Sequence, residues 1–287
     1  MNRAEQQFIE TVWEHYRERG RHDLPWRKRV TPYRVLVSEM MLQQTQVERV
    51  VPKFREFVQR WPSAATLAAA PLGEVLRVWQ GLGYNRRAKY LHEAAVAVHV
   101  VHRDRFPRTL KELQALPGVG PYTAAALMAF AYNEPVVLIE TNVRTVYLHH
   151  FFKDRTDVTD RELLPLIGRT LDRERPRDWY SALLDYGRHL KRTVGNQDIR
   201  SRHYTKQAPF VGSDRQLRAA MLRALTASRG SLTLAALCAA APAEFSSAQV
   251  RAQLAALIGD GLVVRDARRY RLPTEPGGDR TTYCRRY

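Results

Sequence analysis

The sequence predicts a mostly helical protein that ends in a small mixed domain. Over the first ~210 residues, apolar side chains recur at spacings of three and four, the period of an amphipathic helix. After residue 213, three more helical patterns precede two short apolar runs around a basic tip, which is typical of a β-hairpin. The chain has 287 residues and is 45% hydrophobic, which is enough for one large or two smaller cores. We therefore expect an all-α main part with one small hairpin domain.

The helices of the main part are expected to begin at local start signals. The first follows from the stripe of Phe8, Val12, Trp13 and Tyr16. The next begins at Thr31-Pro32, where a capping hydroxyl precedes a proline at the first helical position. Further helices are expected after Ser63, over residues 72–79 before Gly81-Leu82-Gly83, after Thr109 with Glu112 as a capping box, and over residues 142–152.

The helical pattern dissolves between residues 194 and 213, which predicts a first domain over residues 1–213. Residues 214–273 show three helical patterns, then apolar runs at residues 262–264 and 270–272. This is the order of a winged helix, whose third helix and basic tip would bind DNA; a plain interaction module is the alternative. Residues 274–287 are expected to form a flexible basic tail.

Charge and cysteine content limit the classes of protein. A net charge of +17 and a pI near 10.3 indicate a polyanionic partner, although charge alone does not separate DNA from RNA or an anionic membrane surface. Two cysteines, Cys238 and Cys284, exclude a disulfide framework and a four-cysteine metal site. A polar N-terminus and the lack of a long apolar run predict a cytoplasmic protein without a membrane span.

The segment Leu116-Pro117-Gly118-Val119-Gly120 predicts a hairpin that opens a helix. The two glycines permit a tight turn, and Pro121 is suited to the first helical position. The N–H groups of Gly118, Gly120 and the helix start would then face outward and bind a phosphate. The alternative is an ordinary helical turn, but the Ala-rich helix that follows favours DNA backbone binding.

Glu39 is the candidate catalytic acid. It lies on an apolar helix beside Met40 and Leu42, where desolvation would raise the pKa of its carboxyl. A carboxyl protonated near neutral pH can protonate a departing purine, which leaves far better as a neutral base. The alternative is a solvated helix glutamate.

Glu140 is the candidate second carboxylate. It precedes a helix start, where the partial positive charge of the helix N-terminus favours the ionised form. An ionised carboxylate there can stabilise an oxocarbenium-like sugar, as in glycosidases. A purely structural acid near the helix N-cap is the equal alternative.

Four polar or aromatic positions are candidates for contacts with an opened duplex or a flipped base. Gln43 and Gln44 are amides of the type that reads the base left opposite, and Tyr84 can wedge beside a flipped base. Trp26 can stack in a base pocket. The alternatives are surface amides and core aromatic residues.

Five segments, in order, resemble the helix-hairpin-helix DNA glycosylases and, within them, the adenine DNA glycosylase (MutY) family. They are DLPWR, SEMMLQQTQV, WQGLGYNRRAKYLH, LPGVGPYTAAAL and ETNVRTV, between residues 23 and 187. The resemblance implies a two-lobed helix-hairpin-helix core with DNA in the cleft, and excision of a flipped adenine with Glu39 as the acid.

The resemblance also implies roles for single residues. Trp26, Arg27 and Leu42 fall on base-pocket positions, and Gln43 and Tyr84 on positions that contact the opposite base or the DNA step. Tyr122 stands where the strand-cleaving relatives carry a catalytic lysine, so a monofunctional glycosylase is implied. The pocket candidates are therefore Trp26, Arg27, Leu42, Tyr122 and Ser181. The DNA-contact candidates are Gln43, Gln44, Tyr84, Gly118, Val119, Gly120, Thr123, Asn142, Arg144, Lys191 and Arg192.

The chain departs from the family pattern at four places. Glu140 replaces the family's Asp, and Ser181 stands where Gln or Glu is usual. The region from Lys191 to His203 has no cysteine, so no iron–sulfur cluster and no other cofactor or metal is expected. The family's 8-oxoguanine-recognition domain is absent, and the winged-helix domain stands in its place.

These observations predict a DNA repair glycosylase that removes a mispaired adenine and leaves an abasic site. Two alternatives stay open: a glycosylase for thymine, uracil or a deaminated or alkylated base, and a noncatalytic DNA-binding protein of the same fold. The expected partner is double-stranded DNA with a mispaired or damaged base. We expect a monomer that is cytoplasmic and nucleoid-associated and binds no membrane.

Overall fold

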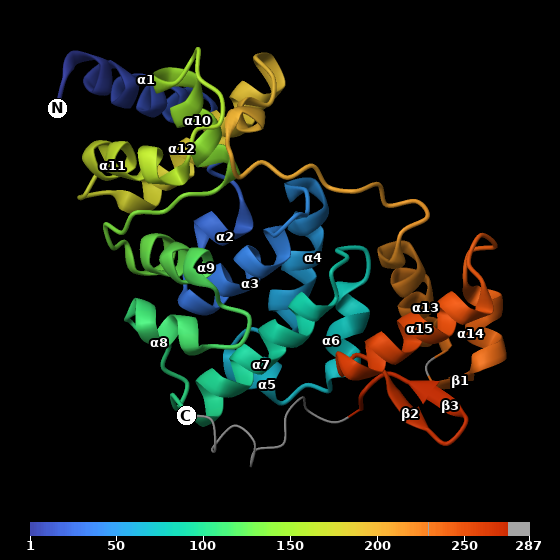
Figure 1. The fold of residues 1–287 in the computed structure, drawn as a ribbon. Helices are drawn as coiled ribbons and strands as arrows, with labels where there is room; N and C mark the ends of the chain where they lie inside the picture. The colour runs from blue at the N-terminus through green and yellow to red at the C-terminus, as the bar shows by residue number, and fades with distance from the viewer. Residues whose placement is uncertain (229, 275–287) are drawn as a thin grey trace. The chain divides into compact units, whose positions relative to one another are not determined.

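The computed structural model of this protein describes residues 1–228 and 230–274. It is mostly helical, with one small sheet near the C-terminal end, which confirms the predicted fold class (Figure 1). The chain forms two compact units. The first consists of Met1–Leu36, Arg108–Gln114 and Val119–Lys206, and the second of Val37–Pro107, Ala115–Gly118 and the residues from Gln207 onward.

The first unit is built around aromatic side chains that are contributed by distant helices. Phe8, from the predicted first stripe, packs against Tyr147 and Trp179 at ring-centroid distances of 5.0 and 6.0 Å. The elements of this unit are α1 (Arg3–Arg19), α2 (Pro25–Lys28), the beginning of α3 (Pro32–Leu42), most of α8 (Leu110–Ala115), α9 (Pro121–Ala126), the π-helical turn η1 (Leu127–Ala131), α10 (Thr141–Phe151), α11 (Asp160–Thr170), α12 (Pro176–Thr193) and the 3₁₀ turn η2 (Gln197–Arg200).

The second unit combines the middle of the chain with the C-terminal segment. Its central helices bury Phe54, Phe57 and Trp79 completely. Its elements are the end of α3, α4 (Val47–Arg60), α5 (Ala64–Ala68), α6 (Leu72–Trp79), α7 (Arg86–Val100), α13 (Asp214–Ser228), β1 (Ser231–Thr233), α14 (Leu234–Ala240), α15 (Ser247–Gly259), β2 (Val264–Asp266) and β3 (Arg269–Arg271).

The predicted helix starts are confirmed by their caps. The Thr31 hydroxyl accepts a hydrogen bond from the Arg34 N–H at 3.2 Å. The Ser63 hydroxyl caps α5 as part of a capping box. Before α8, the Thr109 hydroxyl accepts from the backbone N–H of Glu112 at 3.3 Å. These contacts span three residues each, so the sequence alone specifies them.

Residues 214–273, named here the C-terminal module, have the element order of a winged helix. The three strands form an antiparallel sheet in the order β1-β3-β2, with Leu232 and Arg265 both opposite Tyr270. Three details differ from the prediction. Strand β1 was not predicted, β2 begins at Val264 instead of residue 262, and β3 is Arg269–Arg271 instead of residues 270–272. The backbone N–H groups of Leu262 and Val263 donate to the Leu257 carbonyl and complete the turn after α15, so they are not free for the ladder.

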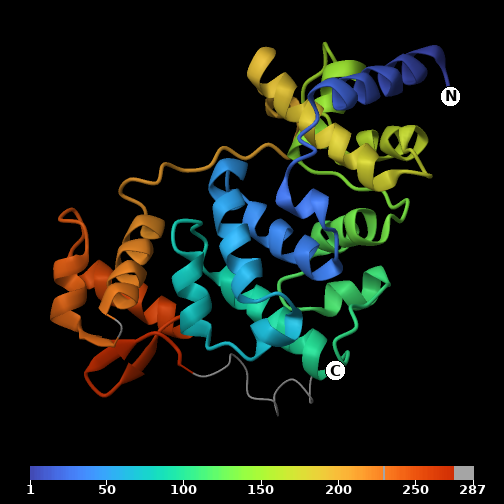
Figure 2. The ribbon, with the colours of Figure 1, turned by 180° about the vertical axis from the view of Figure 1, so that it is seen from behind.

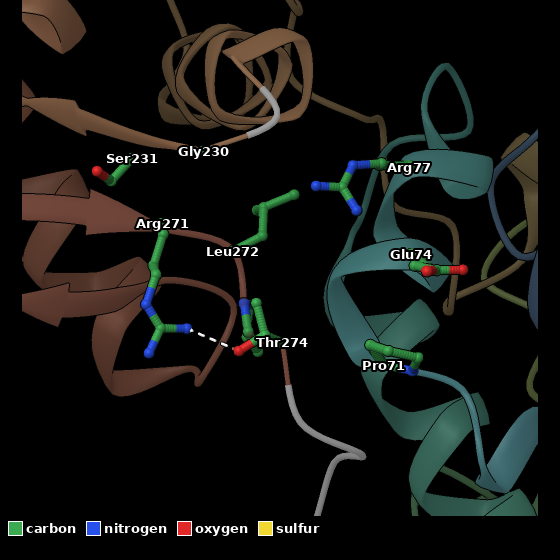
Figure 3. Close-up of a pocket in the computed structure, with 9 residues that line it drawn as sticks. Pro71, Glu74, Arg77, Gly230, Ser231, Arg271, Leu272 and Thr274 are labelled. Atoms are coloured by element: carbon green, nitrogen blue, oxygen red, sulfur yellow. Dashed lines mark hydrogen bonds between the residues drawn. The ribbon is translucent and has the colours of Figure 1, made fainter.

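The C-terminal module joins α6 through backbone contact. The Gly73 N–H donates to the Pro273 carbonyl at 2.8 Å. A Cβ at Gly73 would lie 2.5 Å from that carbonyl oxygen, so only glycine permits this approach. A hollow of about 320 Å³ lies beside the contact, lined on one side by Glu74 and Arg77 of α6 and on the other by residues of the module such as Arg271 (Figure 3).

Some predictions fall outside the structure. Most of the expected flexible tail, residues 275–287 with Cys284, lies outside the described residues. The second unit resumes at Gln207, and the predicted domain boundary at residue 213 stays a prediction. Within residues 1–228 and 230–274, no helix combines the length and the apolar character that a bilayer crossing requires.

Candidate active site

Glu39 lies near the end of α3, inside an apolar stretch. Its side chain is buried, with a residue exposure of 8%. Leu36 and Met40 on the same helix are fully buried. A solvated surface glutamate does not fit this exposure.

The loop after α3 and the loop after α6 are joined by one buried arginine. Arg87 Nη1 donates to the carbonyls of Met40, Met41 and Gln43 at 2.7, 3.0 and 2.5 Å. Its Nη2 donates to the carbonyls of Leu82 and Gly83 at 3.0 and 3.1 Å. Burial lowers the pKa of Arg87 to about 10, so it stays charged at neutral pH and binds the carbonyls at the end of α3.

This connection brings three of the predicted DNA contacts to one tip, which we name the 43–84 tip: Gln43, Gln44 and Tyr84. Gln44 is exposed, and Tyr84 is 38% exposed. Both have left-handed backbones, with φ of 53° and 47°. Such conformations are unfavourable for residues with a Cβ and are characteristic of functional loops.

The predicted hairpin before α9 is present, and its two glycines differ. Gly118 has φ +71°, and a Cβ there would lie 2.5 Å from Tyr90 Cβ and 3.2 Å from Met40 Cε. Gly120 has φ −83°, and a Cβ there would meet nothing within 4 Å, so glycine is not required at this position for steric reasons. Both glycines are exposed and the Val119 side chain is buried, so the backbone is the part that can contact a phosphate.

Glu140 is the N-cap of α10. Its Oε1 accepts from the backbone N–H groups of Asn142 and Val143 at 2.6 and 2.7 Å. Its Oε2 accepts from Asn142 Nδ2 at 3.2 Å, and Lys191 Nζ donates to Asn142 Oδ1 at 3.0 Å. Gly187 of α12 permits this arrangement, because a Cβ there would lie 2.5 Å from the Asn142 carbonyl oxygen.

The charge of Glu140 is determined by opposing effects. Burial is the largest effect and raises the pKa of the Glu140 carboxyl above the ordinary value overall, although the Val143 N–H, Lys191, the Asn142 N–H and Arg144 each lower it. The pKa of Lys191 is lowered by burial and raised by Glu140. Both carboxyl oxygens accept hydrogen bonds from N–H groups, and such contacts stabilise the ionised form against the effect of burial.

Arg27 of α2 lies in an ion pair. Its Nη1 and Nη2 donate to Asp185 at 2.7 and 3.2 Å, and Arg21 binds the same carboxylate through its backbone N–H at 2.8 Å. Burial raises the pKa of Asp185, but Arg27 and Arg21 lower it below its ordinary value overall. Arg27 thereby links α2 to α12; its contact with a base stays a prediction.

Arg144 is likewise bound within the protein. It donates to both oxygens of Asp160 at 2.7 and 3.0 Å and to Asp198 at 3.4 Å. Arg200 donates to the carbonyls of Phe152 at 2.6 Å and Leu148 at 2.9 Å, near the end of α10. These contacts fix the segment after α12 against α10, and they favour a positioning role for Arg144 over direct contact with DNA.

The other predicted site residues differ in exposure. Trp26, Leu42, Tyr122 and Lys191 are partly buried, Thr123 and Ser181 are buried, and Arg192 is exposed. Tyr122 packs against the core of the first unit. Their roles at a base or a phosphate stay predictions.

Arg87 and Asp185 are the main residues that sequence reasoning missed as part of the site. One sequence signal was present for Arg87: it stands on the same helical face as Leu91, Ala94 and Val98, which are fully buried. A charged residue on an apolar face indicates a buried partner network. Among the described residues, no group of three or more His, Cys, Asp or Glu side chains is arranged to hold a metal ion.

The sequence matches known repair proteins. Residues 37–167 match the family described as "HhH-GPD superfamily base excision DNA repair protein". The chain is 35% identical over 280 residues to adenine DNA glycosylase of Mycobacterium tuberculosis, a match that covers 90% of this chain and 91% of that protein. It is 50% identical over 130 residues to adenine DNA glycosylase of Mycolicibacterium smegmatis, covering 45% of this chain and 44% of that protein.

Solved structures confirm the fold. A thermostable thymine-DNA glycosylase is similar with a TM-score of 0.58 and 26% identity, over 65% of this chain and 87% of that chain. An endonuclease III in a non-covalent DNA complex is similar with a TM-score of 0.54 and 19% identity, over 64% of this chain and 86% of that chain. Together with the near full-length match to the mycobacterial protein, these likenesses show that the chain belongs to the adenine DNA glycosylase family of helix-hairpin-helix base-excision repair proteins.

Proposed function

We propose that this protein is a monofunctional DNA glycosylase that removes a mispaired adenine from duplex DNA. The observation that carries the proposal is Glu39, a carboxyl that is 8% exposed within an apolar helix of a chain from the adenine DNA glycosylase family. A carboxyl in such a place holds a proton that a departing purine needs.

The proposed reaction is hydrolysis of the N-glycosidic bond. Glu39 donates its proton to the adenine as the bond between the sugar C1′ and the base breaks. The ionised Glu140 stabilises the positive charge that develops on the sugar. A water molecule then adds its hydroxyl to C1′ and returns a proton to Glu39, so the products are free adenine and an abasic site.

Strand cleavage is not part of the proposal. A glycosylase that also cleaves the strand needs an amine to form a Schiff base with the sugar. Tyr122 occupies the position of that amine in the family pattern, and a phenol does not form an imine. We therefore expect intact abasic DNA as the product.

We also propose that the protein folds without an iron–sulfur cluster. A cluster of the family type needs four Cys thiolates, and the whole sequence has two cysteines, of which Cys238 lies in α14. The residues present therefore do not fit the group. Instead, Arg144 of α10 donates to Asp198, and Arg200 donates to the Leu148 carbonyl of α10, so these two arginines bind the segment after α12 to α10. Iron analysis of purified, folded protein tests this: iron at cluster stoichiometry would overturn it.

A second candidate function is excision of a mispaired thymine. It is favoured by the structural likeness to a thymine-DNA glycosylase at 26% identity. Excision of a pyrimidine depends less on protonation of the leaving base, so the buried Glu39 favours adenine.

One experiment separates these candidates. The full chain is incubated with duplexes that carry adenine opposite guanine, adenine opposite 8-oxoguanine, thymine opposite guanine, or uracil, and alkali then cleaves any abasic site. Cleavage of the adenine strand alone supports the proposal. Cleavage of the thymine strand supports the second candidate, and no cleavage of any strand would leave a DNA-binding protein without glycosylase activity.

The expected monomeric state and the nucleoid-associated, cytoplasmic location are part of the same proposal. The net charge of +17 supports a DNA partner, because neutralising phosphates releases counterions. Sedimentation with and without duplex DNA tests the monomeric state.

A further inference from the structure

Tyr84 lies between two arginines from different parts of the second unit. The guanidinium carbon of Arg87, on α7, lies 5.5 Å from the centre of the tyrosine ring. That of Arg215, on α13 of the C-terminal module, lies 5.6 Å from it. Both distances are within the range of cation–π attraction.

The polar end of the 43–84 tip is bound by the C-terminal segment as well. Arg215 Nη1 donates to the Tyr84 hydroxyl at 2.8 Å. Gln207 Nε2 donates to Gln44 Oε1 at 3.2 Å and also to the Tyr84 hydroxyl. Gln207 thus binds both exposed side chains expected to enter DNA, and Arg215 binds Tyr84; both partners lie over 120 residues further along the chain than Tyr84.

Arg215 is itself held in place. Its Nη2 donates to the carbonyls of Ala208 and Pro209 at 2.5 and 3.2 Å, in the extended stretch that leads into α13 (Figure 2). Of the five N–H groups of a guanidinium, three are therefore used, and within residues 1–228 and 230–274 the other two have no hydrogen-bond partner. They remain available to a phosphate while the tyrosine is held.

The C-terminal module is anchored to the helices that carry Tyr84. Gln80 Nε2 at the end of α6 donates to Thr226 Oγ1 at 3.2 Å. Arg86 at the start of α7 pairs with Asp260 at 3.6 Å. Together with the backbone bond between Gly73 and Pro273, these contacts lie on both sides of the loop that bears Tyr84 and fix Arg215 relative to it.

We propose that Arg215 is a positioning residue through which the C-terminal module holds Tyr84 in the conformation that enters the duplex. The left-handed backbone of Tyr84 is unfavourable by itself, so contacts from outside the loop are needed to maintain it. Arg215 provides such contacts to both the ring and the hydroxyl. The inference rests on the proposed function, because the tyrosine is taken as the side chain that wedges beside the target base.

The test is a double-mutant cycle on binding, made in the full chain with Glu39→Gln so that no turnover occurs. The Kd for a duplex with adenine opposite guanine is measured for Arg215→Met, Tyr84→Ala and the combination. We expect Arg215→Met to weaken binding roughly tenfold when Tyr84 is present and less than about twofold when it is replaced by alanine. With Glu39 restored, KM should rise while the single-turnover rate at saturating enzyme changes little.

Arg223→Met is the matched control. Arg223 is an exposed arginine on the same helix, so this change removes the same charge without touching Tyr84. Its effect should be the same with and without the Tyr84→Ala substitution. Equal weakening by Arg215→Met in both backgrounds would overturn the inference, because the arginine would then act on phosphate alone.

A variant that disturbs folding less keeps the test decisive. Tyr84→Phe removes only the hydroxyl and should weaken binding in the same direction as Arg215→Met; wild-type binding by both variants would overturn the inference. Coupling without excision by the wild-type chain would refute the proposed function but not this inference. Excision by the wild-type chain without coupling between Arg215 and Tyr84 would refute this inference but not the proposed function.

Discussion

Glu39 and Glu140 are both carboxyl groups on helices, but their surroundings differ in kind. Glu39 is buried near the end of α3, where Leu36 and Met40 are fully buried. Glu140 caps the start of α10, where two backbone N–H groups, Asn142 and Lys191 form a chain of donors. Glu39 is thus buried on a helix with apolar neighbours, whereas the carboxylate of Glu140 is bound by N–H groups at a helix start, and the two opposite roles proposed for them rest on this difference.

The largest effect is expected from removing the proposed proton donor, Glu39. Glu39→Gln should lower the excision rate on the order of 10²- to 10⁴-fold, because the amide is nearly isosteric but donates no catalytic proton. Duplex binding should be retained. Single-turnover excision and Kd are measured together, and excision at the wild-type rate would show that another group is the acid.

The second change tests charge against placement at Glu140. Glu140→Gln should lower excision about 10²-fold, because the neutral amide stabilises a cationic sugar poorly. Glu140→Asp keeps the charge but withdraws it by about one bond length, so a smaller loss is expected. If Glu140→Asp is more active than wild type, the glutamate is a compromise and not the residue best suited to this chain.

The next two substitutions test how closely the backbone is packed at Gly118, beside Met40 of α3, and at Gly187, beside Asn142 of α10. Gly118→Ala would place a Cβ 3.2 Å from Met40 Cε with φ at +71°, and Gly187→Ala would place one 2.5 Å from the Asn142 carbonyl oxygen. Each should lower the free energy of unfolding by roughly 1–3 kcal/mol. Gly120→Ala, with nothing within 4 Å, is the control. Thermal unfolding measures all three, and equal stability of the three variants would refute the steric argument.

The smallest expected effect concerns the influence of the Lys191 charge on the pKa of Glu140. Burial raises the pKa of Glu140 and Lys191 lowers it, so Lys191→Met should raise it further. In the proposed mechanism excision requires ionised Glu140, so the acid limb of the pH–rate profile should move to higher pH, with little change well above it. Arg192→Met, which removes an exposed neighbouring charge, should leave that limb nearly unchanged. A shift to lower pH in Lys191→Met would contradict the assignment of Glu140.

The sequence by itself determined several helices, their starts and the family of the protein. The bounds of α6 and the caps at Thr31 and Ser63 follow from neighbours within a few residues, so local patterns predicted them. The apolar stretch around Glu39 predicted its burial for the same reason. The order of five motifs was sufficient for the family, because each motif is a local run of residues.

Only the tertiary structure decided which side chains are partners. Arg87 donates hydrogen bonds to two loops that are about 40 residues apart in the chain, and Arg215 contacts Tyr84, from which it is separated by 131 residues in the chain. Strand β1 was missed because three residues become a strand only when β3 lies beside them. Hydrogen bonds and ion pairs between distant residues depend on packing that no local pattern contains, whereas caps and helical periodicity depend only on residues close in the chain.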